Sequence, residues 1–226
     1  MNCLLRKIKK FVIGSLLFTG LPVLAWGIGD ASGYFKNPAR TTYTILMIVS
    51  ALLVVLFVSN EGTGSGLGEK AIQRQKWTIL LLQVTSIAIL VVSPGSDRRE
   101  VAAMGASALI RYAGLVLTFL GYSLMSLAVV GLGRQFSLDV TVQKDHRLIT
   151  SGQYRHVRHP RYLGIVCFMS GISLVFRSWL GFVPALATLA VLLWRIGDEE
   201  KLMHREFGAA WEEYVRRSKR LMSFVF

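Results

Sequence analysis

A short polar stretch, "YRHVRHPRYLG" at residues 154–164, places three arginines and two histidines between two apolar runs. Proline favours the first position of a helix, and the residue before it is pushed out of helical geometry. We therefore predict a helix that begins at Pro160, with N–H groups and a positive dipole end that suit a carboxylate ligand. Alternatively, the proline only starts the helix, and basic side chains such as Arg155 and Arg158 face lipid as anchors.

A second polar cluster, "WRIGDEEKL" at residues 194–202, follows the last apolar run. Arg195 and Glu199 are four residues apart, so they share one face of a helix. Ionisable groups at the end of a membrane helix are costly unless they pair or bind a ligand. The spacing is equally compatible with a simple salt bridge and with a binding site.

Apolar runs must position both clusters. The chain has 226 residues, of which 53% are hydrophobic, and a mean hydropathy of +0.49. A helix needs about 17–25 mostly apolar residues to cross a bilayer. We predict an all-α, polytopic integral membrane protein with about five to six transmembrane helices. Its expected spans are residues 11–28, 42–59, 77–93 and 106–132, followed by a C-terminal helical hairpin over residues 163–176 and 179–194.

The net charge of +13 lies in short segments between the apolar runs. If the N-terminus is cytoplasmic, 20 of the 26 Lys and Arg residues fall in cytoplasmic segments. Positive charge is enriched on that side of membranes, so both termini are predicted to be cytoplasmic. The same distribution favours contact with the lipid bilayer over nucleic-acid binding. Cys3 and Cys167 are far apart and outside any CxxC pattern, so no metal site is expected.

Taken in order, these pieces resemble the isoprenylcysteine carboxyl methyltransferase family and its bacterial relatives, which are similar to phospholipid methyltransferases. The family pattern has a histidine, L-[VI]-T-x-G-x-Y and R-H-P-x-Y-x-G; after a helical hairpin come R-x-x-x-E-E-x-x-L and F-G-x-x-[YW]-x-x-Y. This chain has "HRLITSGQYRHVRHPRYLG" and then "RIGDEEKLMHREFGAAWEEY", with the same order and spacing. The match covers about residues 136–214, and the preceding spans agree in hydropathy only.

The resemblance implies S-adenosylmethionine as methyl donor, bound in a cytosolic helical region and covered by the C-terminal tail. It also implies a bacterial-type inner membrane as the location. Arg195 matches the arginine that the family uses at the reacting centre, and Glu199 joins it as a catalytic position. The positions carried over as cofactor-binding are Gln143, His146, Arg147, Leu148, Ile149, Tyr154, His159, Pro160, Arg161, Tyr162 and Glu199.

This interpretation divides the chain into two regions. Residues 1–132 form an N-terminal four-helix transmembrane region, and residues 133–226 form the catalytic region with its cytosolic loop, helical hairpin and C-terminal helix. The tail sequence "RLMSFVF" lacks the proline of the family's usual ending.

The residue types also bear on the methyl acceptor. A carboxylate is already a nucleophile at neutral pH because carboxyl pKa values lie near about 4, so its methylation needs no general base. An amine or thiol would need one. We therefore expect a lipophilic or lipidated carboxylate as acceptor, with phospholipid N-methylation or thiol S-methylation as alternatives on the same scaffold.

Two other classes are weaker. An NADPH-dependent membrane reductase is disfavoured because the sequence has no phosphate-binding G-x-G-x-x-G. A transporter or non-catalytic scaffold is disfavoured because the ionisable residues gather at one predicted membrane face rather than near the middle of several spans.

Overall fold

The computed structural model describes residues 2–57, 75–132 and 148–221. Within these ranges the chain is helical, with isolated β-bridges and no named strand. Its α-helices are α1 (Asn2–Ser15), α2 (Leu21–Trp26), α3 (Ala31–Phe35), α4 (Pro38–Phe57), α5 (Gln75–Arg99), α6 (Ala108–Leu132), α7 (Pro160–Val175), α8 (Phe182–Phe207) and α9 (Ala209–Arg217). A π-helical turn over Leu16–Gly20 joins α1 to α2, and 3-10 turns cover Ile28–Asp30 and Gly152–Arg155.

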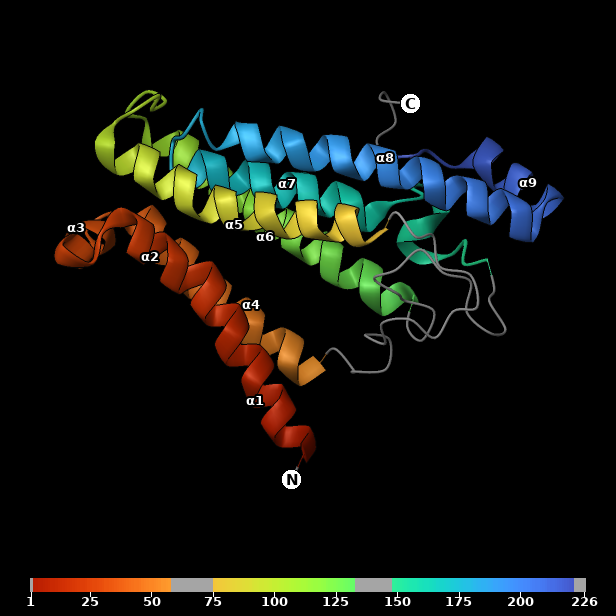
Figure 1. Cartoon of the computed structure of the whole chain (residues 1–226), viewed down its shortest axis with the longest axis horizontal. Helices are drawn as coiled ribbons and strands as arrows, with labels where there is room; N and C mark the ends of the chain where they lie inside the picture. The colour runs from red at the N-terminus through yellow and green to blue at the C-terminus, as the bar shows by residue number, and fades with distance from the viewer. Residues whose placement is uncertain (1, 58–74, 133–147, 222–226) are drawn as a thin grey trace.

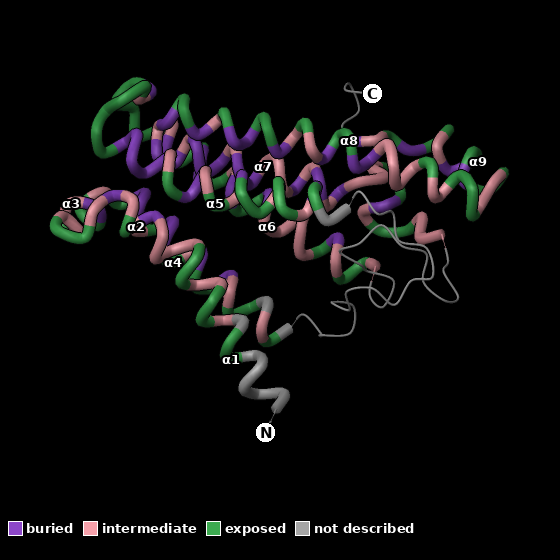
Figure 2. Tube along the Cα trace, in the orientation of Figure 1, coloured by how far each residue is buried: buried purple, intermediate pink, exposed green. Residues whose placement is uncertain are grey.

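The helices form two groups (Figure 1). The long helices α5, α6, α7 and α8 lie side by side as a bundle, and α9 folds back at the far end of α8. Helices α1, α2 and α4 form an arm that contacts the bundle near α3 and diverges from it towards the N-terminus. The residues coloured as buried in Figure 2 lie where the helices of the bundle contact one another and where the arm joins the bundle.

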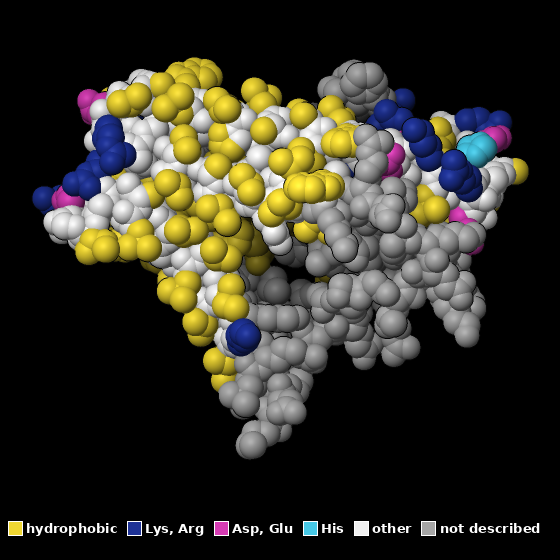
Figure 3. All heavy atoms as spheres, in the orientation of Figure 1, with side chains coloured by type: hydrophobic (Ala, Val, Ile, Leu, Met, Phe, Trp, Pro, Cys, Tyr) yellow, Lys and Arg dark blue, Asp and Glu magenta, His cyan; other side chains and the backbone are white. Residues whose placement is uncertain are grey.

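Several helices are apolar enough for a membrane. Trp77–Arg99 and Ala108–Leu132 each suffice to span it, and Phe11–Trp26 with Ile28–Phe35 is a third candidate, bent by 85°. Pro38–Leu53 and Pro160–Val175 are shorter apolar helices. Exposed apolar side chains cover the flanks, while most of the visible charges gather at the two ends (Figure 3). This confirms the all-α membrane fold, while the count of five to six spans stays a prediction.

One predicted boundary was wrong. The third span was expected to end at residue 93, but α5 continues through Pro94 to Arg99. The last apolar run ends at residue 194 as expected, and α8 continues without a break into the polar sequence up to Phe207, in agreement with the helix predicted for Arg195 and Glu199. The turn of the predicted hairpin is confirmed: α7 ends at Val175, α8 begins at Phe182, and Arg177 between them has a φ of 47°.

The closest helix contact joins α6 and α7 through glycines on both sides. A Cβ added at Gly114 would lie 2.5 Å from the backbone nitrogen of Val175, and one at Gly164 would lie 2.8 Å from the carbonyl oxygen of Gly121. Small residues let membrane helices approach until their backbones touch. Because α7 begins at the candidate site described below, this contact fixes the position of the site relative to α6.

Replacing Gly121 by alanine is expected to lower the free energy of unfolding by about 1–3 kcal/mol, the usual cost of overpacking. The added Cβ would overlap the backbone nitrogen of Phe168 and lie 2.7 Å from the carbonyl oxygen of Gly164. Gly197→Ala is the matched control, because a Cβ there meets nothing within 4 Å and alanine favours a helix interior. Thermal unfolding of both variants in one detergent checks this. Equal midpoints would contradict the close-contact explanation.

A buried cluster of charges lies at the opposite end of the bundle from the start of α7. Asp97 of α5 has a fully buried side chain and binds the guanidinium groups of three arginines, at 3.0 Å for Arg40, 2.8 Å for Arg111 and 3.1 Å for Arg177. Arg111 also donates to the carbonyl oxygen of Val175 at the end of α7, 2.7 Å away. The cluster therefore connects α4, α5, α6 and the α7–α8 turn.

Candidate functional site

The predicted helix start at Pro160 is confirmed. Pro160 is the first residue of α7, and His159 before it has φ −122° and ψ 59°, outside helical geometry. The imidazole of His159 stacks on the ring of Tyr162, with an interplanar angle of 3° and 5.6 Å between centroids. The start of α7 thus presents a histidine and a tyrosine side by side.

Helix α8 brings Arg195 and Glu199 to this pair. The Nε of Arg195 donates to the hydroxyl of Tyr162 at 2.8 Å and to Oε1 of Glu199 at 3.2 Å. The Tyr162 hydroxyl donates to the same Glu199 oxygen. Both polar clusters of the sequence therefore meet in one network, although 33 residues separate Tyr162 from Arg195.

His159 lies between two carboxylates of α8. Its Nδ1 is 3.4 Å from Oε2 of Glu199, and its Nε2 is 3.4 Å from Oε1 of Glu200. Carboxylates only accept hydrogen bonds, so both ring nitrogens must carry protons to bind them. Burial alone lowers the pKa of His159, but the two carboxylates outweigh it and hold this pKa above its ordinary value. The two carboxylates therefore favour the doubly protonated, cationic form of His159.

The same contacts keep both glutamates ionised. Burial raises the pKa of Glu199, but His159, Arg195 and Tyr162 bring it below its ordinary value. Burial likewise raises the pKa of Glu200, and its hydrogen bonds from His159 and two arginines lower it to about 2. Both groups are anions at physiological pH, so they can accept hydrogen bonds from a ligand or from neighbouring cations.

Glu200 also holds the C-terminal tail against the start of α7. Its Oε1 accepts from the Nε of Arg158 at 2.9 Å, and its Oε2 accepts from the Nε and Nη2 of Arg220 at 3.0 and 2.5 Å. The segment before α7 and the tail also pair through their backbones. Lys219 N donates to His156 O at 2.8 Å, Arg158 N to Lys219 O at 2.7 Å, and His159 N to Arg220 O at 3.2 Å.

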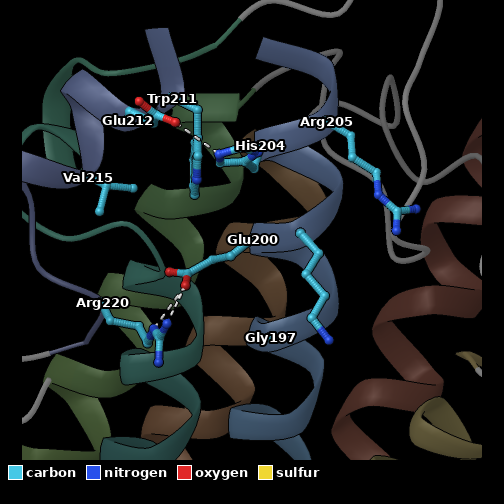
Figure 4. Close-up of a pocket in the computed structure, with 9 residues that line it drawn as sticks. Gly197, Glu200, His204, Arg205, Trp211, Glu212, Val215 and Arg220 are labelled. Carbon is cyan, nitrogen blue, oxygen red and sulfur yellow. Dashed lines mark hydrogen bonds and ion pairs between the residues drawn. The ribbon is translucent and has the colours of Figure 1, made fainter. Parts of the chain in front are cut away.

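The tail contributes an apolar contact as well. Leu221 is buried in a cluster with Tyr162, Leu192 and Ile196. A cavity of about 560 Å³ opens between α8, α9 and the tail, where the side chains of Glu200, Trp211 and Arg220 lie near one another (Figure 4). The tail up to residue 221 therefore covers one side of the candidate site.

The predicted cofactor-binding residues fall into four groups. His159, Pro160, Tyr162 and Glu199 lie together at the α7–α8 junction with Arg195. Tyr154 is buried nearby, donating to Ala128 O at 3.2 Å and accepting at its carbonyl from the Tyr214 hydroxyl at 2.6 Å. Leu148, Ile149 and Arg161 are half-buried. Gln143, His146 and Arg147 lie outside the described residues.

Two residues of the site were missed or misplaced from the sequence. The prediction that Arg158 faces lipid is wrong: its side chain is 8% exposed and bound to Glu200, and it also donates to Ser218 O at 2.6 Å. Arg220 is not among the site residues predicted from the sequence. The two adjacent glutamates after Arg195 could have indicated such partners, because a second buried carboxylate needs cations of its own. Among the described residues, no group of three or more His, Cys, Asp or Glu could hold a metal ion.

The sequence and the fold match known proteins. Residues 114–205 match the Isoprenylcysteine carboxyl methyltransferase (ICMT) family. A probable protein-S-isoprenylcysteine O-methyltransferase of Oryza sativa subsp. indica is 32% identical over 123 residues, which are 51% of this chain and 62% of the rice protein. The protein-S-isoprenylcysteine O-methyltransferase of Schizosaccharomyces pombe is 35% identical over 105 residues, 43% of each chain. The matched part thus spans less than two thirds of these relatives.

A solved structure has a similar fold. The eukaryotic intramembrane Ras methyltransferase ICMT (isoprenylcysteine carboxyl methyltransferase) aligns with 90% of this chain and 74% of its own, with a TM-score of 0.53 and 20% identity. The resemblance expected from the motifs is therefore confirmed for the family region, and the fold is that of a multi-pass membrane protein.

Proposed function

We propose, from the premise that residues 114–205 of this chain belong to the isoprenylcysteine carboxyl methyltransferase family, that the protein is an S-adenosylmethionine-dependent methyltransferase of the membrane. Its proposed acceptor is a lipophilic carboxylate, as in O-methylation of an isoprenylcysteine. The observation that carries the proposal is the network of Arg195, Tyr162, Glu199 and His159 at the α7–α8 junction. Phospholipid N-methylation and thiol S-methylation remain the alternatives on this scaffold.

The residues present fit such a donor. S-adenosylmethionine supplies a methyl group on a sulfonium and also carries an ammonium, a carboxylate and a ribose diol. The Glu199 side chain is 22% exposed, so its carboxylate remains accessible to hydrogen-bond donors. The guanidinium of Arg161, at the start of α7, is a cation that suits the carboxylate of the donor. The further cofactor positions, among them Gln143, His146 and Arg147, are proposed on the family resemblance alone.

Arg195 is proposed to orient the acceptor. Its side chain is 5% exposed and already fixed by Tyr162 and Glu199 through its Nε. A fixed planar guanidinium can hold a carboxylate in one orientation, and alignment is what a transfer without a general base requires. The residue types at the junction therefore favour a carboxylate over an amine or thiol.

The proposal also includes the membrane orientation and the division of the chain into two regions. The N-terminus, the C-terminus and the α7–α8 junction are placed on the cytoplasmic side, on the distribution of Lys and Arg. The chain is divided into an N-terminal transmembrane region (1–132) and a catalytic region (133–226). The relatives matched are eukaryotic, so a bacterial-type inner membrane is not supported by them.

Purified protein is expected to bind S-adenosylmethionine, and Glu199→Ala is expected to weaken this binding by roughly tenfold or more, the effect of losing a charge-assisted hydrogen bond of about 1.5–3 kcal/mol. Isothermal titration calorimetry measures both affinities. Glu213→Ala is the control, since Glu213 is 67% exposed on α9 and pairs only with Arg217 in the described structure. Wild-type protein that shows no binding heat would overturn the proposed function.

The acceptor class has a separate test. Membranes containing the protein are incubated with methyl-labelled donor, and the labelled lipid is then treated with mild base. Release of volatile methanol is expected, because a methyl ester is base-labile whereas an N-methyl amine or a thioether is not. Base-stable label would favour the N- or S-methylation alternatives.

A further inference from the structure

The two neighbouring glutamates of α8 make different contacts. Glu199 binds Tyr162 and Arg195, the groups proposed to act at the reacting centre. Glu200 binds Arg158 and Arg220, which belong to the segment before α7 and to the tail. His159 contacts both carboxylates, one with each ring nitrogen. Glu200 is thus linked to the reacting centre through a single imidazole ring.

We propose that Glu200 is a positioning residue, which keeps His159 doubly protonated and thereby holds the Glu199 carboxylate in place for the methyl donor. This proposal rests on the function proposed above and deepens it. Glu200 needs no contact of its own with donor or acceptor. Its carboxylate is 13% exposed, and both of its oxygens are occupied by the described cations.

The physical reason is the geometry of the imidazole. If His159 loses one proton, the deprotonated nitrogen places a lone pair against a carboxylate, and that contact becomes repulsive. Either Glu199 loses its imidazole partner or the ring turns away from its stacked position on Tyr162. Removing the partner that orients a metal-binding histidine commonly lowers metal affinity by about 10–100-fold, and we expect a loss of roughly 10-fold in donor affinity when His159 loses its position. Donor affinity should therefore fall as pH rises past the pKa of His159.

The charged and titratable groups around His159 come from α7, α8, the segment before α7 and the tail. Helix α8 contributes the two carboxylates and one guanidinium, α7 contributes one phenol, and the neighbouring segment and the tail contribute one guanidinium each. These groups are Glu199, Glu200, Arg195, Tyr162, Arg158 and Arg220. The two carboxylates are the groups that raise the pKa of His159, and burial of the ring opposes them.

Arg220 provides a way to separate this role from simple docking of the tail. It occupies Oε2 of Glu200, whereas His159 faces Oε1 (Figure 4 shows the Arg220 contact). Removing Arg220 loosens the tail but leaves Glu200 free to hold His159. Removing the charge of Glu200 loosens the tail and also deprives His159 of one carboxylate. Both changes therefore break the contact of the tail through Arg220, but only Glu200→Gln removes a carboxylate from His159.

The experiment measures donor affinity by calorimetry across pH for wild type, Glu200→Gln and Arg220→Gln. In Glu200→Gln the loss of affinity at rising pH is expected to begin about one pH unit lower, the size of shift that one neighbouring charge produces. In Arg220→Gln it should begin at the wild-type pH or higher. Glu212→Gln is the matched control, because this carboxylate lines the same cavity but pairs with the exposed His204; its profile should follow wild type.

Each contrary result has a distinct meaning. A Glu200→Gln profile that coincides with wild type overturns the positioning role. Equal downward shifts in Glu200→Gln and Arg220→Gln also overturn it, because they would show that Glu200 acts only by docking the tail. Wild-type protein without donor binding would instead overturn the proposed function.

A second variant covers the case in which Glu200→Gln does not fold. His159→Gln removes the titrating ring, so the loss of donor affinity assigned to it should disappear from the pH profile. Thermal unfolding of each variant at one pH identifies those that are folded. A pH-dependent loss that persists unchanged in folded His159→Gln protein overturns the proposal.

Discussion

Replacing Asp97 by asparagine should lower the thermal unfolding midpoint by roughly 10 °C, corresponding to about 3–5 kcal/mol for breaking a buried ion cluster in a chain of this size. Asp97 is fully buried and accepts hydrogen bonds from Arg40, Arg111 and Arg177. Asparagine has almost the same shape but no charge, so three guanidinium groups would remain without their carboxylate. Buried charges without a counter-charge are among the largest single causes of instability.

Asp30→Asn is the matched control for this prediction. Asp30 also accepts hydrogen bonds, from Trp26 Nε1 at 3.1 Å and from the backbone nitrogen of Gly33 at 3.1 Å, at the start of α3. Asparagine is as good an N-cap as aspartate, so this variant should stay within about 1 kcal/mol of wild type. Adding Arg177→Met to Asp97→Asn should restore part of the loss by removing one surplus cation. Circular dichroism melting in one detergent compares the four proteins, and equal midpoints for the two asparagine variants would contradict the prediction.

The Asp97 cluster also explains why one boundary could not be predicted from the sequence. A proline followed by "GSDRRE" indicates a loop, because proline removes a helical hydrogen bond and the following residues are polar. In the structure α5 continues through this stretch, and Asp97 is bound by arginines 57, 14 and 80 residues away. Local propensity cannot reveal partners at such separations. The start of α7 was predictable because proline acts locally, on its own backbone and that of His159.

The candidate site could likewise be predicted from the sequence only in part. The shared face of Arg195 and Glu199 follows from helical spacing, and the structure has this ion pair at 3.2 Å. Their contact with His159 and Tyr162 was expected only through the family resemblance, since it depends on how α7 packs against α8. The role of Arg158 was mispredicted because its partner Glu200 lies 42 residues further along the chain. A basic residue beside a membrane helix is typical of a lipid anchor, and only the fold shows which ones turn inward.

Arg195→Lys is expected to lower kcat for methyl transfer by about 100-fold, the size of effect seen when one fixed electrostatic contact at a reacting centre is lost. The Nε of Arg195 already donates to Tyr162 and Glu199, so the guanidinium is held in one orientation, in which it is proposed to face an acceptor carboxylate. Lysine keeps the charge but has a single ammonium and no planar fork, so it cannot make both sets of contacts with fixed geometry. The lower kcat would therefore result from poorer alignment of the acceptor, because the positive charge is kept.

The orienting role predicts that Arg195→Lys changes kcat but not the affinity for the methyl donor. The affinity of Arg195→Lys for S-adenosylmethionine should stay within about threefold of wild type, because the carboxylate of Glu199 and its contact with His159 remain; an interaction that acts only on the transferring step changes kcat alone. Glu199→Ala should show the reverse, with weaker donor binding as its primary defect. Arg217→Lys is the control, since this arginine is 57% exposed on α9. Calorimetry and initial-rate measurements with labelled donor give both quantities. Arg195→Lys protein with wild-type kcat would mean that charge alone suffices there, and the proposed orienting role would have to be abandoned.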